Sequence, residues 1–333
     1  MDMPARKLSE IGEFGLIGRI RDLFPAPDGV KGIGDDCAVL PQRSGRDTLV
    51  STDMLVEGTH FLRADIPPYR LGWKSAAVNV SDIAGMGGRP TATFLSVALP
   101  ADLEADWVDE FLRGYADLSG RFGVALLGGD TTASPDRICI NVAVLGECPS
   151  GAARLRSAAR PGDCVCVTGP LGDSAAGLKA ILDGVERDAD VQALIDRHYL
   201  PLPRVEEGLQ LAATPGVHAM MDISDGIGSD LGHILEASGC GARIDVAALP
   251  LSPALRRVCA RLGWDAPALA IGGGEDYELL FTVSIGDYEK VEQMEGVRLI
   301  GHITDKSLGA MLVTRDGSEL ELKAQGWNPL KES

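Results

Sequence analysis

The residues of this chain with the plainest chemistry are aspartates that stand beside glycine turns or at the ends of apolar runs. Two of them, Asp35 and Asp36, are adjacent in "GIGDDCAVL" at 32–40. Adjacent carboxylates repel each other and both ionise at neutral pH, so the pair needs a cation or an exposed position. Similar settings recur at Asp36, Asp53, Asp82, Asp130, Asp222 and Asp225.

These aspartates predict a site for a divalent cation. Asp53 and Asp130 are expected to end strands, and Asp222 stands between a strand and a helix. Strand ends are where α/β proteins place ligands, and carboxylates that converge there need a hard cation such as magnesium. Asp82 is expected on a helix with Asn79 three residues earlier on the same face. Any one aspartate alone could instead cap a helix or form a turn.

Other signatures of nucleotide or metal sites are missing or ambiguous. The chain has no G-x-x-x-x-G-K-[ST] loop, no protein-kinase glycine loop with its lysine, and no zinc spacing among its histidines. "TGPLGDSAAG" at 168–177 could hold an anion at a helix N-terminus or be a plain turn. "IGGGEDYELLF" at 271–281 puts Glu275 and Asp276 after three glycines, which would let the backbone approach a ligand closely.

Composition indicates a folded protein that does not bind nucleic acid or a membrane. The 333 residues carry a formal net charge of −17, and no Lys/Arg-rich run offsets it, which argues against tracking of a nucleic-acid backbone. No apolar stretch is long enough to span a membrane, and the N-terminal segment lacks the apolar core of a signal peptide. The seven scattered cysteines are expected to be free thiols. We therefore expect a cytoplasmic protein.

The elements that must position the aspartates alternate between strands and helices, which predicts an α/β (or α+β) protein of two domains. The predicted domains are 1–148 and 149–333. In the first, strands are expected at 47–56, 91–99, 123–129 and 138–146, and helices at 68–87 and 103–123. In the second, strands are expected at 163–169, 217–221, 242–247, 277–284, 297–302 and 311–314, and helices at 173–185, 189–197, 203–213, 253–262 and from 227.

Ordered motifs along nearly the whole chain carry a family resemblance. They are "GIGDDCAVL", "STDMLVEGTHF", "KSAAVNVSDIAGMG", "LLGGDTT", "RSAARPGD", "GDSAAGL", "DISDGIGSDLGHI", "GGGEDYELLFT" and "GWNP". With these motifs the sequence resembles the thiamine-monophosphate kinases, in the superfamily that includes aminoimidazole ribonucleotide synthetase. The resemblance implies the two-domain fold of that superfamily. Its N-terminal domain would bind ATP and Mg²⁺ and pair by its sheet across a homodimer, and its C-terminal domain would close over the active site.

The resemblance also implies an activity, the last step of thiamine diphosphate biosynthesis, in which ATP phosphorylates thiamine phosphate with several Mg²⁺ ions. It assigns contacts with ATP to Gly129, Asp130, Arg156 and Ser224. It assigns magnesium ligation to Asp36, Ser51, Thr52, Asp53, Asp82, Asp130, Asp222 and Asp225. It assigns contacts with thiamine phosphate to His60, Glu275 and Trp327.

The implied chemistry needs neither a general base nor a covalent nucleophile. The second pKa of a phosphate monoester is about 6, so the acceptor oxygen is already anionic near pH 7. The obstacle is repulsion between two polyanions, which metal ions and Arg156 would offset by position and charge. The cationic thiazolium of thiamine suits an acidic pocket and an aromatic face. On this interpretation Asp36 faces metal, and Asp35 only supports the turn.

Several alternatives stay open on sequence alone. Selenophosphate synthetase would need a reactive cysteine near the N-terminus, and the hydrogenase-maturation relative would need a C-terminal cysteine where this chain has "WNPLKES". Aminoimidazole ribonucleotide synthetase is the nearest rival in fold. A regulator that binds Mg-nucleotide without catalysis is the rival from another class. The acceptor-side positions His60 and Glu275 favour the kinase.

Overall fold

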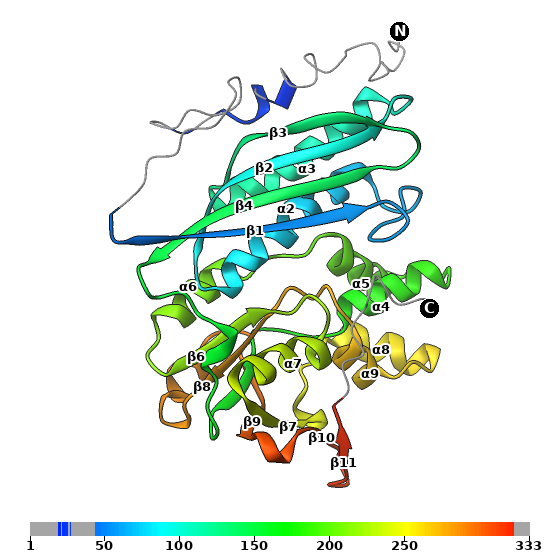
Figure 1. The fold of residues 1–333 in the computed structure, drawn as a ribbon. Coiled ribbons are helices and arrows are strands. Elements are labelled where there is room, and N and C mark those ends of the chain that lie inside the picture. Colours follow the sequence, from blue (N-terminus) through cyan, green and yellow to red (C-terminus); the bar gives the residue numbers. More distant parts are fainter. Residues whose placement is uncertain (1–18, 21, 26, 28–43, 323–333) are drawn as a thin grey trace. The chain divides into compact units, whose positions relative to one another are not determined.

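The computed structural model describes residues 19–20, 22–25, 27 and 44–322. Contacts between residues divide the chain into two compact units, described here in turn. The first comprises Met1–Ile83 and Arg89–Ser150, and the second comprises Ala84–Gly88 and Gly151–Ser333 (Figure 1). Asp35, Asp36 and Trp327 lie outside the described residues. None of the helices in the described part of the chain is long and apolar enough to cross a membrane.

Between residues 44 and 150 the first unit forms a four-stranded sheet with α2 and α3 on one face (Figure 1). Its strands lie in the order β1-β4-β2-β3, with β4 antiparallel to β1 and β2, and with β2 parallel to β3. Along β1, β2 and β4, residues on the face that the helices cover are in general more buried than their neighbours. The elements are β1 (Arg46–Val56), α2 (Pro68–Gly85), β2 (Arg89–Pro100), α3 (Ala105–Phe122), β3 (Ala125–Ser134) and β4 (Cys139–Pro149).

The helices α2 and α3 cross at very short range because each has a glycine at the crossing. A Cβ atom on Gly72 would lie 1.8 Å from the Phe111 carbonyl oxygen, and one on Gly114 would lie 1.8 Å from the Tyr69 carbonyl oxygen. Neither position has room for a side chain. This contact fixes the position of α2, which carries Asn79 and Asp82.

The second unit is a mixed seven-stranded sheet in the order β11-β10-β7-β9-β5-β8-β6. Its neighbours are antiparallel except for the parallel pair β10 and β7. The strands are β5 (Cys164–Val167), β6 (Val217–Asp222), β7 (Cys240–Asp245), β8 (Leu279–Val283), β9 (Arg298–Asp305), β10 (Ala310–Val313) and β11 (Glu319–Glu321). The α-helices are α4 (Asp173–Leu182), α5 (Ala189–Tyr199), α6 (Val205–Ala213), α7 (Ile227–Ser238), α8 (Pro253–Leu262), α9 (Ala266–Gly272) and α10 (Glu289–Glu292). The 3-10 helices are η1 (Arg156–Ala158), η2 (Val246–Ala248), η3 (Ile285–Asp287) and η4 (Lys306–Leu308).

The mixed α/β class predicted from the sequence is confirmed, and the predicted strand at 47–56 matches β1, but Asp53 and Asp130 do not end strands as expected. β1 continues past Asp53 to Val56, and β3 continues past Asp130 to Ser134. The polar "DTTAS" segment of β3 stays extended because it pairs with β2 residue by residue as far as Ser134. Asp53 and Asp130 therefore lie inside strands, whereas Asp222 is the last residue of β6.

Candidate functional site

The first unit holds a cluster of acidic and polar groups between β1 and α2. The Ser51 hydroxyl Oγ donates to Asp82 Oδ2 at 2.5 Å, and the Asp53 backbone N–H donates to Asn79 Oδ1 at 3.1 Å. Ser51 and Asp53 share a face of β1 because they are two residues apart, and Asn79 and Asp82 are neighbours on α2 because they are three apart. The fold thus brings together three predicted metal ligands, Ser51, Asp53 and Asp82.

The charge of this cluster fits a hard divalent cation. Burial, followed by repulsion from Asp82, raises the pKa of Asp53 to about 6. Two carboxylates in such a half-buried place are costly to ionise together unless a positive charge stands beside them. Carboxylate and hydroxyl oxygens are the ligands that Mg²⁺ accepts, together with waters and phosphate oxygens.

Two other predicted ligands, Thr52 and Asp130, belong to the opposite face of the sheet. The Thr52 Oγ1 atom accepts a hydrogen bond from Asn141 Nδ2 at 3.0 Å. Asn141 is paired with Ser96 on β2, and Ser96 is paired with Asp130 on β3. Residues paired directly across a sheet point to the same face, so Asp130 and Thr52 both lie on the face that the helices leave open. The side chains of Thr52 and Asp130 therefore do not join the cluster between β1 and α2.

Gly129 and His60, predicted to contact ATP and thiamine phosphate, have clear structural roles. Gly129 has a φ of 153°, and a Cβ atom there would lie 1.7 Å from the Leu95 carbonyl oxygen. Only glycine fits at this point of the β2–β3 contact. The His60 Nδ1 atom accepts the Val56 N–H at 3.0 Å, which places the proton of the neutral ring on Nε2.

In the second unit Asp222 ends β6, and the loop that follows carries Ser224 and Asp225. Asp230, in the first turn of α7, accepts the backbone N–H groups of Ser224 and Asp225, each at 3.1 Å. Burial, followed by repulsion from Asp225, raises the pKa of Asp230 to about 7. Asp230 thus holds the loop in shape, a role that its place in "DISDGIGSDL" hinted at but that we did not predict.

Charges of both signs surround Asp225. Burial and the Glu275 carboxylate raise the pKa of Asp225, whereas His233 and the predicted ATP contact Arg156 lower it. Ligand atoms of Asp225, Asp230 and His233 all lie within 4.8 Å of one another, close enough to hold a metal ion. Arg156 and Glu275, which are far from Asp225 in sequence, therefore both act electrostatically on it in the folded unit.

The glycines before Glu275 let its loop pack tightly against the loop of Ser224. A Cβ atom on Gly274 would lie 2.4 Å from the Ser224 carbonyl oxygen. That oxygen accepts the Glu275 N–H at 2.8 Å, and the Ile223 carbonyl oxygen accepts the Tyr277 N–H at 2.9 Å. The sequence suggested a backbone that approaches a ligand, and the close approach that the structure contains is between two loops of the protein.

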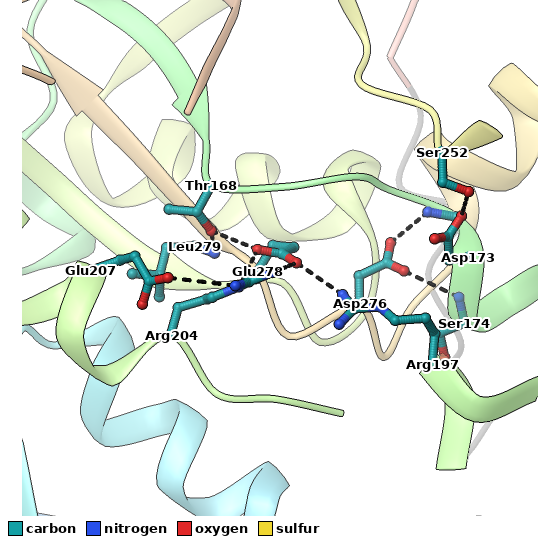
Figure 2. Close-up of polar contacts among 11 residues, drawn as sticks. Thr168, Asp173, Ser174, Arg197, Arg204, Glu207, Ser252, Asp276, Glu278 and Leu279 are labelled. Atoms are coloured by element: carbon teal, nitrogen blue, oxygen red, sulfur yellow. Dashed lines mark hydrogen bonds and ion pairs between the residues drawn. The ribbon is translucent and has the colours of Figure 1, made fainter. Parts of the chain in front are cut away.

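The N-terminus of α4, one possible anion site, is occupied by a side chain of the protein itself (Figure 2). The Asp276 carboxylate accepts the Gly172 N–H at 2.7 Å and the Ser174 N–H at 3.3 Å. Burial raises the pKa of Asp276 to about 8, against the lowering effect of these two donors. The sequence left open either an anion site or a plain turn at this point. In the structure, the Asp276 side chain takes up the N–H groups that an anion would bind.

A buried ion cluster lies next to Asp276 and was not predicted (Figure 2). The Glu278 side chain is fully buried. It accepts two hydrogen bonds from Arg204, at 2.6 and 2.7 Å, and one each from Arg197, at 2.9 Å, and Thr168, at 2.8 Å. In the sequence, the only sign of this cluster is a glutamate placed directly before an apolar strand. Its partners named in the cluster are 74 to 110 residues away, so no local pattern marks them.

Two family models match the chain. They are the AIR synthase related protein, N-terminal domain, at residues 34–148, and the AIR synthase related protein, C-terminal domain, at 160–313. The thiamine-monophosphate kinase of Salmonella typhimurium is 44% identical, with 82% of each chain covered. That of Escherichia coli is 41% identical, with 95% of this chain and 98% of the relative covered.

Solved structures agree with these relatives. The crystal structure of thiamine-monophosphate kinase from Stenotrophomonas maltophilia has a TM-score of 0.82 and 37% identity and covers 93% of this chain and 98% of its own. AaThiL complexed with AMPPCP and TMP has a TM-score of 0.78 and 35% identity and covers 98% of this chain and 100% of its own. The hydrogenase maturation protein HypE in complex with ATP, at 20% identity and a TM-score of 0.79, covers 96% of this chain and 98% of its own and shares the fold. From these matches, the chain belongs to the thiamine-monophosphate kinase family, within the AIR synthase related proteins.

Proposed function

We propose that this protein transfers the γ-phosphoryl group of ATP directly to thiamine phosphate and so makes thiamine diphosphate. The observation that carries the proposal is the match to thiamine-monophosphate kinases over 82% and 95% of this chain. The AaThiL complex with AMPPCP and TMP supports both substrates. Among the rivals, HypE resembles this chain at only 20% identity, which speaks for a common fold alone.

The reaction needs binding and charge compensation more than proton transfer. The oxygen of the acceptor phosphate is ionised near pH 7, because the second pKa of a monoester is about 6. The task left to the protein is to hold two polyanions in line at short range. We place Arg156 at the ATP phosphates, because the Arg156 guanidinium already acts on the carboxylate of Asp225.

We propose that Mg²⁺ binds at the acidic clusters of both units. When bound, it would neutralise phosphate charge and orient the transferring group. In the first unit the Ser51–Asp53–Asp82 cluster supports this role by its oxygen donors and the raised pKa of Asp53. In the second unit Asp222 ends β6, and Asp225 stands on the following loop, which Asp230 holds. Asp36, Thr52 and Asp130 are further proposed ligands, of which Thr52 and Asp130, on the open face of the sheet, would hold an ion apart from the Ser51–Asp53–Asp82 cluster. The proposed ATP contacts also include Gly129, Asp130 and Ser224. The proposed acceptor contacts are His60, Glu275 and Trp327.

We further propose a homodimer that pairs through the open face of the first unit's sheet. Residues of β1 alternate, so Leu55 is buried under the helices while Val50 and Met54 lie on the open face. Val50 is 68% exposed and Met54 is 56% exposed. Large apolar side chains on a sheet face of a single chain are typical of a surface that another chain covers.

We place the protein in the cytoplasm. Cys164 and Cys166 are buried and free, although they are neighbours on β5. Cys240 and Cys259 are also buried free thiols. Unpaired cysteines of this kind are typical of proteins from a reducing compartment.

The test is release of ADP from ATP with Mg²⁺, measured with and without thiamine phosphate. A kinase releases ADP and forms thiamine diphosphate in equal amounts, and only when thiamine phosphate is present. A regulator that binds nucleotide without catalysis would release none under either condition. Aminoimidazole ribonucleotide synthetase activity would be indicated by ADP release that thiamine phosphate does not stimulate and that formylglycinamidine ribonucleotide does.

A further inference from the structure

The side chain of His198, near the end of α5, lies against the proposed acceptor contact Glu275. The His198 Nδ1 atom is 3.3 Å from Glu275 Oε2 and 3.0 Å from Ser174 Oγ. The His198 side chain is only 5% exposed, whereas that of Glu275 is 29% exposed. A buried imidazole thus contacts the carboxylate from the inside, while part of that carboxylate reaches the surface.

The role of this contact depends on which ring nitrogen of His198 carries the proton. An ionised carboxylate can only accept hydrogen bonds, so Nδ1 must carry the proton for the contact with Glu275 to be attractive. The hydroxyl of Ser174 can accept from the same Nδ1–H or donate elsewhere. A neutral His198 that donates from Nδ1 would fix the orientation of the Glu275 carboxylate and leave its negative charge in place.

The backbone at Glu275 is strained and needs such support. Glu275 has a φ of 63° and Tyr277 a φ of 51°, both in the left-handed region that residues with a side chain rarely adopt. Strained residues persist where the surrounding structure determines their conformation, and they concentrate at ligand sites. Here the Glu275 N–H and the Tyr277 N–H are both held by carbonyl oxygens of the loop after β6.

The end of α5 holds the same loop at a second point. Arg197, the residue before His198, donates to Glu278 at 2.9 Å, and Arg204 donates to it twice (Figure 2). Glu278 is three residues after Glu275, so one short segment of α5 contacts the acidic loop through two consecutive side chains. The buried ion cluster anchors the loop at Glu278, and His198 contacts the side chain of Glu275 at the more exposed end of the loop.

We propose that His198 is a positioning residue for the thiamine-phosphate subsite, acting through Glu275. The inference rests on the proposed function and deepens it, because it names the residue that orients the acceptor-side carboxylate. A fixed carboxylate suits thiamine, which presents a cationic ring and an aminopyrimidine donor to an acidic partner. His198 itself is not among the proposed ATP contacts, so its removal should act first on thiamine phosphate.

The experiment compares His198→Ala and His198→Asn with the wild-type protein. Loss of the 3.3 Å contact between His198 Nδ1 and Glu275 Oε2 frees the carboxylate from its orientation, and a tenfold loss of affinity corresponds to about 1.4 kcal/mol. We therefore expect His198→Ala to raise the KM for thiamine phosphate about tenfold and to leave the KM for ATP within about twofold. His198→Asn should recover most of the loss, because its amide nitrogen takes the place of Nδ1. Thermal melts of both variants check that the fold is retained.

Two further variants separate positioning from a general structural effect. His218→Ala removes a comparable histidine, whose Nδ1 lies 2.9 Å from Asp163 Oδ2, and should change neither KM. In a Glu275→Ala background, the additional change His198→Ala should have no further effect on the Kd for thiamine phosphate. Equal increases in both KM values, an unchanged KM for thiamine phosphate, or full additivity with Glu275→Ala would overturn the role of His198. Wild-type protein that does not phosphorylate thiamine phosphate would overturn the proposed function, and this inference with it.

Discussion

At the scale of single residues, the metal assignment in the first unit depends on Asp53 and Asp82. The pKa of Asp53, raised to about 6 by burial and by Asp82, shows that the protein places negative charge where a cation would be needed. We predict that Asp53→Asn lowers turnover more than tenfold, which corresponds to about 1.4 kcal/mol in the barrier. The fold should persist, because the substitution also removes a repulsion. Steady-state rates and thermal melts check both parts.

We predict the same loss of turnover for Asp130→Asn, although Asp130 lies on the other face of the sheet. Asp102→Asn, in the exposed turn before α3, is the matched control and should keep full activity. A variant at Asp53 or Asp130 that kept more than about a tenth of wild-type turnover would remove that residue from the ligand set.

The buried carboxyl of Asp276 makes a prediction about pH. Burial raises its pKa from 3.8 to about 8, so between these values the folded protein holds a proton that the unfolded chain releases. The contribution of Asp276 to stability therefore falls as pH rises through this window, by at most about 1.4 kcal/mol per pH unit. In Asp276→Asn this dependence is absent. Urea unfolding from pH 5 to pH 8 should show the variant gaining stability relative to wild type, and a constant difference would contradict the raised pKa.

Sequence alone identified the residues that stand in motifs, but not those that act through distant partners. Asp222, Ser224, Asp225 and Glu275 were predicted as site residues, and the structure places them at the end of β6 and on two adjoining loops. His198 and Glu278 were missed because their partners are remote in sequence. Glu278, for example, is 81 residues from Arg197 and 74 from Arg204. A buried ion pair has no local pattern until the fold brings its members together.

At the scale of elements, the crossing of α2 and α3 should be sensitive to a single methyl group. We predict that Gly114→Ala lowers the free energy of unfolding by about 3 kcal/mol, because its Cβ atom would lie 1.8 Å from a backbone oxygen of the other helix. Gly120→Ala, on the same helix, is the control, since nothing lies within 4 Å of its Cβ position. That variant should be more stable by roughly 0.5–1 kcal/mol. Equal effects of the two substitutions in urea unfolding would contradict the close crossing.

Most elements were predictable because their apolar periodicity is strong, and the failures have local causes. β3 was predicted to end before Asp130, but its polar half is held by pairing with β2 and not by its own composition. β11 was missed because its residues are all exposed. α9 was missed because it is only seven residues long. Its start depends on Asp265, whose Oδ1 atom accepts the Ala268 N–H.

At the scale of the whole molecule, the open face of the first unit's sheet predicts self-association. We expect light scattering at micromolar concentration to give the mass of two chains. Met54→Glu should give the mass of one chain, because it places a charge on the open face, where Met54 is 56% exposed. Leu182→Glu, at a 62% exposed position in the second unit, should remain a dimer. A wild-type mass of one chain would contradict pairing through this face.

The central claim is that the acceptor is a phosphate that is already ionised, so that the protein needs no general base. The most direct measurement supplies thiamine, thiamine phosphate and thiamine diphosphate separately, each with ATP and magnesium, and follows the products. The free hydroxyl of thiamine, with a pKa near 16, would need a positioned base, and its oxygen would not reach metal ions placed for a phosphate. We predict rapid conversion of thiamine phosphate to thiamine diphosphate and at most slow turnover of thiamine. Comparable turnover of free thiamine would contradict the account, and the search for a base would then begin at His60.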